Sequence, residues 1–336
     1  MTSPSAPRPS KPATILDVAA AAGVSRQTVT RAMNSMPGIK PATRERILGL
    51  AKDLGYTPSR FAKGLVQGAR TSVGLAIPDL TNPYFPAFAS SVVELATQRG
   101  WYVVMDDYGH GRGSGLEAVR NLSPHVDAVI GYLGGDAGPA QALLGRRPLI
   151  VLDQPAGTAA GCISFDYAHA AKLALDHLAS AGRRHIAYLD VRQAGEVPTV
   201  RGAAFAGLFG SAGTELTCFS ADESAECARR AVRNLLARNP QTDGIVVFND
   251  LMAAGALKAL TDMGRSAPAD CAVIGMDGIP LGELLTPELT TLALDLRDVG
   301  RAAVDLLEQL MGGIVPDGAP APELVLRHRL VLRQSA

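Results

Sequence analysis

Apolar runs alternate with helix-like stretches from residue 71 almost to the end of the chain, and this alternation most constrains the fold. Short apolar runs predict buried strands, and the segments between them have the spacing of amphipathic helices. Strands are predicted near 73–77, 102–105, 128–132, 149–152, 163–165, 185–189, 216–219, 244–248 and 272–275. Helices are predicted near 84–99, 114–122, 137–145, 167–181, 198–210, 223–238 and 250–264, followed by a helix near 297–312 and a strand near 323–333.

Alternating strands and helices predict an α/β fold with parallel sheets, right-handed crossovers and helices on both sheet faces. The strands form two series, one before and one after about residue 165. The simplest arrangement is two doubly wound subdomains with a cleft between them.

In open parallel sheets, ligands bind beyond the carboxyl ends of the strands. The residues there are Asp79, Asn82, Tyr84 and Phe85 after the first strand, Asp153 after the fourth, and then Phe219, Asn249, Asp250 and Asp277. Arg201 lies early in the helix that follows strand 185–189. Carboxylates, amides and a guanidinium beside aromatic rings fit a small polyhydroxylated or heteroaromatic ligand, because rings stack on its face while planar polar groups bind hydroxyls.

The stretch 14–34 has the pattern of two short helices joined by a tight turn. Apolar residues at 15, 18, 19 and 22 give the first helix one stripe. Gly23 suits the turn because it has no Cβ, and Ser25 can cap the second helix. A third helix from about Pro41 would complete a small bundle.

The second helix turns Val29, Ala32 and Met33 inward and leaves a polar side outward. That side carries Arg26, Gln27, Thr30, Arg31 and Asn34. These side chains fit the reading of base edges in a DNA major groove. Taken alone, the helix also fits an ordinary amphipathic helix with a solvated polar face. The turn glycine and the cap together favour DNA binding.

Charge is distributed unevenly along the 336 residues, although the net charge is zero. Residues 1–70 hold 11 Lys/Arg and 3 Asp/Glu, for a net +8, whereas the remainder holds 21 and 29, for a net −8. A basic N-terminal segment on an acidic body favours a polyanion-binding head over a merely solvated basic surface.

Cysteine usage and the N-terminus indicate a cytoplasmic protein. The four cysteines have no CxxC spacing, which argues against a zinc site or a disulfide framework, and we expect no metal and no cofactor. Residues 1–12 are rich in Pro and Ser, without the apolar core of a signal peptide, and predict a flexible tail. No run approaches the roughly 18 apolar residues of a membrane span.

Specific motifs across nearly the whole chain resemble the lactose/galactose-repressor (LacI/GalR) family of bacterial transcription regulators. The densest is TILDVAAAAGVSRQTVTRAMN at 14–34, followed by TRERI at 43 and LGYTPSR at 54. Later matches are DxxNPYF at 79, FND at 248, VIGMD at 273 and PxLTT at 287.

The resemblance implies roles in DNA binding for specific residues of the head. Arg26, Gln27 and Arg31 would read bases, and Ser25, Thr28, Asn34 and Thr43 would contact phosphates or orient the head. Segment 59–66, from Ser59 on, matches a hinge helix that folds on the operator, with Leu65 wedged into the minor groove beside Ala62. A helix this short is unstable alone in water, so its ordering would depend on DNA and on the partner subunit.

The resemblance also implies a type I periplasmic-binding-protein-like body that senses an effector and dimerises. Arg201 and Asp277 would be its central polar ligands, and Phe219 would stack on the effector. The expected division is a tail at 1–12, a helix-turn-helix domain at 13–58, a hinge at 59–70 and an effector domain at 71–336. Within the latter, the N-subdomain takes about 71–165 and 296–318, and the C-subdomain about 166–295 and 319–333.

The function expected from these features is a homodimeric regulator, in most cases a repressor, on a near-palindromic operator. Its effector would be a sugar or a nucleoside-like metabolite, acting either as inducer or as co-repressor. A sugar-binding transport protein fits less well, because the signal peptide is missing and the head is basic. An enzyme is not expected, since the histidines lack metal spacing and no serine lies in a GxSxG elbow.

Overall fold

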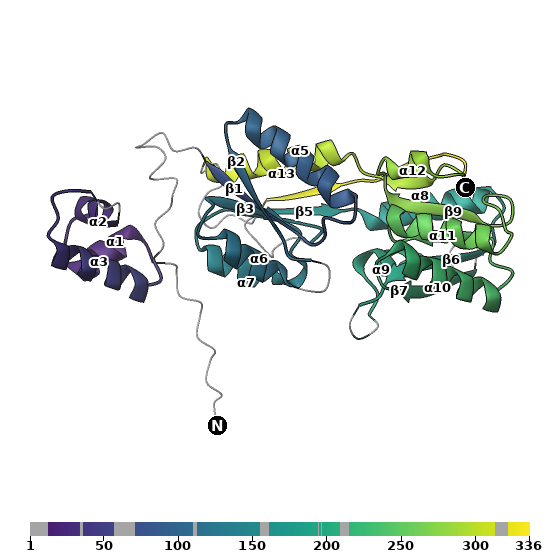
Figure 1. Cartoon of the computed structure of the whole chain (residues 1–336), viewed down its shortest axis with the longest axis horizontal. Coiled ribbons are helices and arrows are strands. Elements are labelled where there is room, and N and C mark those ends of the chain that lie inside the picture. The colour runs from purple at the N-terminus through teal and green to yellow at the C-terminus, as the bar shows by residue number, and fades with distance from the viewer. Residues whose placement is uncertain are drawn as a thin grey trace, which may run out of the picture.

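The computed structural model shows a small helical head followed by an elongated two-part α/β body (Figure 1). It describes residues 13–33, 36–56, 71–109, 113–154, 161–193, 195, 197–208, 215–312 and 322–336. The predicted tail and hinge segment, 1–12 and 59–70, lie outside the described residues, and so do the site candidates Asn34, Ser59, Ala62 and Leu65.

The head consists of α1 (Ile15–Ala22), α2 (Arg26–Met33) and α3 (Pro41–Asp53). Gly23 ends α1 in the left-handed conformation (φ 61°), and the Ser25 hydroxyl accepts a hydrogen bond from Thr28 N, as the sequence predicted. Val29 and Ile47 are fully buried in a core that is otherwise mostly alanine. A core of such small side chains contributes little hydrophobic free energy, so caps and hydrogen bonds matter more in this domain.

The first subdomain is built on a six-stranded sheet that is parallel throughout. Its order is β11 (Glu323–Leu326), β5 (Gly161–Phe165), β4 (Leu149–Leu152), β3 (Ala128–Gly131), β1 (Ser72–Ile77) and β2 (Tyr102–Asp107). Helices α5 (Tyr84–Gln98) and α13 (Leu296–Met311) pack together on one face, and α6 (Gly115–Leu122) and α7 (Ala137–Leu144) cover the other (Figure 1). A short 3-10 turn, η1 (Gly134–Asp136), precedes α7.

The second subdomain has a matching sheet with one antiparallel edge strand. Its order is β12 (Arg329–Val331), β10 (Thr290–Ala293), β9 (Ala272–Asp277), β8 (Gly244–Val247), β6 (His185–Val191) and β7 (Glu215–Ala221), and β12 runs antiparallel to β10. Helices α8 (Tyr167–Ser180) and α9 (Val200–Gly207) contact each other, as do α10 (Ala225–Arg238) and α11 (Asp250–Asp262). The short α12 (Leu281–Leu284) contacts α11.

The single strand predicted near 323–333 is in fact two strands in different sheets. β11 pairs with β5 of the first subdomain, and β12 pairs with β10 of the second. Residues 323–326 therefore belong to the first sheet and not, as predicted, to the C-subdomain. Between the two strands the buried His328 ring packs against Phe165 and Tyr167, where the chain crosses between subdomains. Only Arg327, His328 and Arg329 separate the apolar runs 324–326 and 330–332, which is why the pattern resembled one strand.

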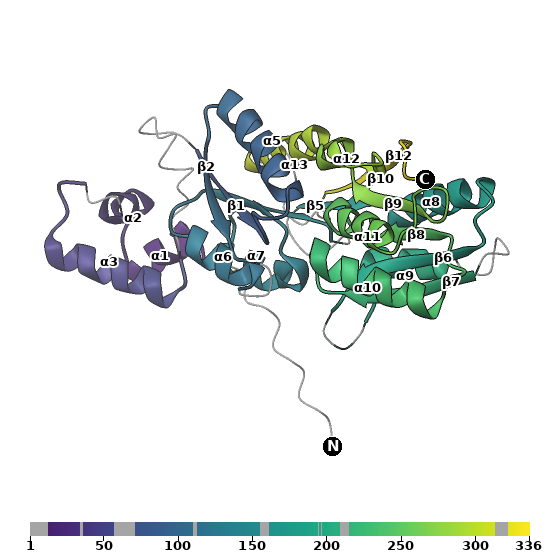
Figure 2. The same ribbon diagram turned by 45° about the vertical axis from the view of Figure 1, so that its right-hand side comes forward.

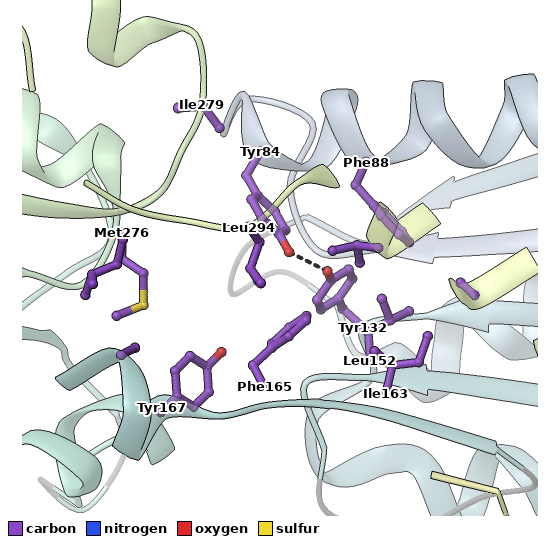
Figure 3. Close-up of a cluster of buried hydrophobic side chains, with 14 of the residues drawn as sticks. Tyr84, Phe88, Tyr132, Leu152, Ile163, Phe165, Tyr167, Met276, Ile279 and Leu294 are labelled. Atoms are coloured by element: carbon purple, nitrogen blue, oxygen red, sulfur yellow. Dashed lines mark hydrogen bonds between the residues drawn. The ribbon is translucent and has the colours of Figure 1, made fainter. Parts of the chain in front are cut away.

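One hydrophobic cluster extends through both subdomains (Figure 3). Tyr84 and Tyr132 come from the first subdomain and face Tyr167 and Met276 of the second across the junction. The chain passes this junction after β5, after β10 and after β11, so three crossings and a shared apolar cluster link the two halves. Figure 2 shows the same arrangement from a second side. None of the described helices is long and apolar enough to span a membrane.

Candidate functional site

Helix α2 presents three long polar side chains to solvent. Arg26, Gln27 and Arg31 are exposed, whereas Thr28 and Thr30 are half-buried. Thr30 donates its hydroxyl to the carbonyl of Arg26 (3.1 Å), and the Ser25 and Thr28 hydroxyls lie 2.9 Å apart at the helix start. Short hydroxyl side chains thus support the helix, and the long side chains remain available to reach a groove.

Two other arginines of the head are used inside it. Arg46 donates to the carbonyl of Ala22 at the end of α1 (3.0 Å), and Arg44 donates to the carbonyl of Met36 (2.7 Å). A guanidinium at a helix C-terminus satisfies a carbonyl that has no partner within the helix. Thr43, the phosphate-contact candidate, is half-buried in the first turn of α3.

A cavity of about 200 Å³ lies between the two subdomains, at the carboxyl ends of their strands. Side chains from both sheets line it, as expected for a ligand site in parallel sheets. Seven of the predicted effector residues contribute to its wall: Asn82, Tyr84, Phe85, Asp153, Arg201, Asn249 and Asp277.

Arg201 lines this cavity and is contacted by residues of several elements. Its Nη1 donates to the carbonyl of Phe248 (2.8 Å) and lies 3.5 Å from Asp277 Oδ1, while its Nε donates to the Tyr167 hydroxyl (3.1 Å). The guanidinium also lies over the Phe248 ring, 4.3 Å from the ring centroid. Since the side chain is only 12% exposed and held on several sides, it presents a fixed fork of donors.

Two aspartates from opposite subdomains flank Arg201. Asp153 follows β4 and accepts a hydrogen bond from the Tyr167 hydroxyl (2.7 Å), and Asp277 ends β9. Burial raises the pKa of Asp277 well above its usual range, although the Arg201 cation acts in the opposite direction. Both residues have positive φ, 58° for Asp153 and 127° for Asp277, which is costly for a side chain with a Cβ. Backbone strain of this kind concentrates at ligand sites.

Two buried asparagine amides and one glutamate form the polar end of the cavity. Asn82 Nδ2 donates to Glu223 Oε1 (3.1 Å), and Asn249 Nδ2 donates to the same oxygen (2.8 Å). Asn249 also caps α11, because its Oδ1 accepts from Met252 N (2.8 Å). Helix capping therefore fixes the direction of this amide.

Aromatic rings form the wall on the first subdomain. Tyr84 and Tyr132 share a hydrogen bond between their hydroxyls (2.7 Å; Figure 3), and Phe85 meets both rings edge to face. The Tyr108 hydroxyl donates to the carbonyl of Tyr132 (2.6 Å). Burial raises the pKa of Tyr84 and of Tyr132, so both stay protonated and can donate a hydrogen bond at neutral pH.

Three predicted effector residues do not line this cavity. The half-buried Asp79 accepts hydrogen bonds from Thr81 N and Oγ1 (2.7 and 2.6 Å). Asp250 is fully buried and accepts from Gly278 N, Ile279 N and Thr291 Oγ1, so it braces the loop behind Asp277.

Phe219 was predicted to end its strand and stack on the effector, but β7 continues to Ala221. Its ring packs against the cluster beneath α10 and α11 and lines a separate surface hollow. The residue that reaches the cleft from this strand is Glu223, two positions beyond the strand end.

The sequence-based prediction also missed Glu223, Phe248, Tyr132, Tyr108 and Tyr167. Phe248 and Tyr132 carried a usable signal, because each lies at the end of a predicted strand. Glu223 and Tyr108 follow strands whose ends were predicted two residues early, at 219 and 105 instead of 221 and 107. The described residues hold no cluster of three or more His, Cys, Asp or Glu that could bind a metal ion.

Both parts of the chain match family models. Residues 14–59 match the bacterial regulatory proteins of the lacI family, and residues 175–336 match a periplasmic-binding-protein-like domain. The ribose operon repressor of Halalkalibacterium halodurans is 32% identical over 298 residues, which cover 88% of this chain and 89% of that repressor. The transcriptional regulator reg1 of Streptomyces lividans is also 32% identical, over 96% of both chains.

Solved structures show the same similarity. A LacI family transcriptional regulator from Arthrobacter sp. FB24, solved in complex with lactose, is 64% identical with a TM-score of 0.76, covering 80% of this chain and 99% of that one. The lac repressor dimer bound to operator and an anti-inducer is 29% identical, with a TM-score of 0.70 over 97% of this chain and 99% of that one.

A helix-turn-helix head joined to a two-subdomain body with a polar cleft defines a DNA-binding regulator controlled by a small molecule. The chain belongs to the LacI family of bacterial transcription regulators. It is an effector-controlled DNA-binding regulator, and the relatives named above are regulators of transcription, not enzymes.

Proposed function

We propose that the protein is a homodimeric repressor whose operator affinity is set by a neutral sugar in the cleft. The arrangement of Arg201 between Asp153 and Asp277 carries this proposal. A fixed guanidinium between two carboxylates offers donors and acceptors side by side, which matches the adjacent hydroxyls of a sugar ring. The Arthrobacter relative, 64% identical, was solved with lactose, which is the first sugar to test.

The charge of the cleft favours a neutral ligand over an anionic one. Three acidic side chains, those of Asp153, Glu223 and Asp277, line the cavity with one guanidinium, that of Arg201. An added phosphate or carboxylate would meet like charges at short range in a partly dry site. A nucleoside-like ligand is a weaker candidate, because the Phe248 face that could stack on a base is covered by Arg201.

On DNA, we propose that α2 lies in the major groove and that Arg26, Gln27 and Arg31 read base edges. Ser25, Thr28, Thr30 and Thr43 would contact phosphates or orient the helix, as would Asn34. Two heads related by the dimer axis would then read the two halves of a near-palindromic operator. The lac repressor, 29% identical over nearly the whole chain, was solved as a dimer on its operator. By the family resemblance, Ser59 would begin a DNA-contacting hinge helix, and Leu65 would enter the minor groove beside Ala62.

A two-part binding experiment tests the proposed function. Thermal shift with lactose, galactose, galactose 6-phosphate and adenosine should show stabilisation by a neutral sugar and none by the phosphate, because bound ligand stabilises the folded state. The stabilising sugar should then alter the mobility of the complex with an operator selected from random DNA. Stabilisation by the phosphorylated sugar alone would contradict the assignment.

A further inference from the structure

One carboxylate, that of Glu223, joins the two walls of the cleft. Its Oε1 accepts from Asn82 of the first subdomain (3.1 Å) and from Asn249 of the second (2.8 Å). Hydrogen bonds to an ionised acceptor are stronger than neutral ones. A single oxygen atom thus ties the loop after β1 to the loop after β8.

Both amides are held in place by their own subdomains. Asn82 Oδ1 accepts from Tyr84 N (3.1 Å), and Asn249 Oδ1 accepts from Met252 N (2.8 Å). Neither amide can flip without losing that bond, so both NH₂ groups point toward Glu223. Each NH₂ carries two hydrogens, so one can bind Glu223 while the other serves a ligand hydroxyl. The residues are 3% and 1% exposed, which limits competition from water.

The contact lies far from the places where the chain crosses between subdomains. In the first sheet the crossing strands β11 and β5 are at one edge, and Asn82 follows β1, next to the opposite edge. In the second sheet the crossing strands β12 and β10 are at one edge, and Glu223 follows β7 at the other. A bond remote from a hinge opposes rotation about that hinge with a long lever arm.

We propose that Glu223 is a positioning residue that latches the cleft: it holds the two subdomains together and orients Asn82 and Asn249 toward the effector. This inference rests on the proposed function for its second half only. Without the latch, the subdomains open in the absence of ligand, and the effector must then bear the free-energy cost of closing them.

The first half is tested on the full-length protein without any ligand. Spin labels at Gln98→Cys and Gln241→Cys, both on exposed residues, report the distance between the subdomains. The background carries Cys218→Ser and Cys227→Ser, and labelled chains are diluted with unlabelled ones. Adding Glu223→Ala should broaden the distance distribution. Glu223→Gln keeps one acceptor oxygen and should have a narrow distance distribution like that of the parent. The control Glu226→Ala, which removes a neighbouring exposed carboxylate of α10, should leave the distribution unchanged.

The second half is tested by calorimetric titration with lactose. Glu223→Ala should weaken binding on the order of tenfold, within the usual range of coupling between sites. Glu226→Ala should bind lactose like the parent protein, and Glu223→Gln, which keeps an acceptor oxygen, should bind lactose more tightly than Glu223→Ala. Lactose affinity unchanged in Glu223→Ala would overturn the role in effector binding.

The two halves fail separately. If the ligand-free distance distribution of Glu223→Ala equals that of the parent, the latch is wrong whatever the effector is. If that distribution broadens but the parent protein binds no lactose, the latch stands and lactose is wrong as the effector.

Discussion

The head and the body of this protein differ in how their candidate binding residues are distributed along the chain. The head places its proposed DNA-reading residues, Arg26, Gln27 and Arg31, on one helix, so they are neighbours both in sequence and on the surface. The body gathers Asp153, Arg201 and Asp277 from segments that lie far apart in the chain. The residues of a site on one helix can therefore be found from the helical period alone, whereas those of a cleft depend on where each strand ends.

The largest effect is expected from Asp277→Asn, which should weaken sugar binding in the body without changing DNA binding by the head. This change replaces one carboxyl oxygen by an NH₂ group beside Arg201, and asparagine tolerates positive φ better than most residues. We expect sugar affinity to fall about 100-fold, or about 3 kcal/mol, because an acceptor is lost in a buried site and a donor then faces the guanidinium. Calorimetry measures the loss, and operator affinity without ligand should be unchanged.

The matched control for this prediction is Asp79→Asn. Asp79 also follows a strand, but its carboxylate is held by Thr81 and does not line the cavity. Sugar affinity should stay at the parent value. A loss in Asp79→Asn as large as that in Asp277→Asn would contradict the geometry of the cleft.

Arg31→Ala should have the opposite pattern of effects, on DNA binding by the head and not on sugar binding in the body. Loss of one base contact should weaken operator binding by about 2 kcal/mol, roughly 30-fold, and leave sugar affinity intact. Fluorescence anisotropy at fixed salt is the measurement. Arg238→Ala removes an exposed arginine from α10 of the body and should not alter operator affinity. Equal losses in the two variants would mean that binding is a general charge effect.

His328 should make the stability of the body, but not of the head, sensitive to acid. Burial, together with the nearby Arg201 cation, lowers the pKa of His328 from 6.5 to about 3. In the unfolded chain His328 binds a proton as pH falls through 6.5, whereas in the folded state it stays neutral until about pH 3. The free energy of unfolding is therefore highest above pH 6.5 and decreases as pH falls below it. Between pH 7 and pH 5 His328 alone should cost the body about 2 kcal/mol of stability. Asp250, whose pKa burial raises to about 6, offsets part of this cost because the folded state then binds the proton more readily.

Urea denaturation at the two pH values checks this prediction, and His328→Phe should remove most of the pH-dependent loss. Residues 1–70 contain no histidine, so the transition of the head serves as an internal reference. A body transition with the same pH dependence in His328→Phe as in the parent would show that other groups control it.

The smallest effect is expected from Arg46→Ala within the head. The variant loses the hydrogen bond to the carbonyl of Ala22 and a positive charge at the end of α1. Together these should cost about 1 kcal/mol of head stability. Calorimetric scanning should show a lower melting temperature for the head and an unchanged transition for the body. No change in the head transition would mean that the carbonyl binds water equally well.

Much of the fold could be predicted from the sequence, because strand and helix periods alternate so regularly after residue 71. The final crossing could not, since β11 and β12 are separated only by Arg327 and His328 and belong to different sheets. Which sheet each strand joins depends on which sheet edge is available for pairing, and the local sequence pattern contains no information about that.

Part of the cleft was predictable because some polar side chains that follow a strand do line it, as Asn249 and Asp153 do. It was not predictable where a strand continues beyond its apolar run. β7 extends two residues past Phe219, so Glu223 and not Phe219 reaches the cleft. Asp79 and Asp250 show a second limit. Both follow strands, but backbone amides and hydroxyls nearby capture their carboxylates.

Control of DNA binding in the head by ligand binding in the cleft can be measured in a single titration. Operator affinity is measured by anisotropy on the selected operator, with and without saturating lactose, for the parent protein and for Asp277→Asn. We predict at least a fivefold change for the parent and no change for the variant. Equal operator affinities for the parent with and without bound lactose, its binding confirmed by calorimetry, would contradict the account.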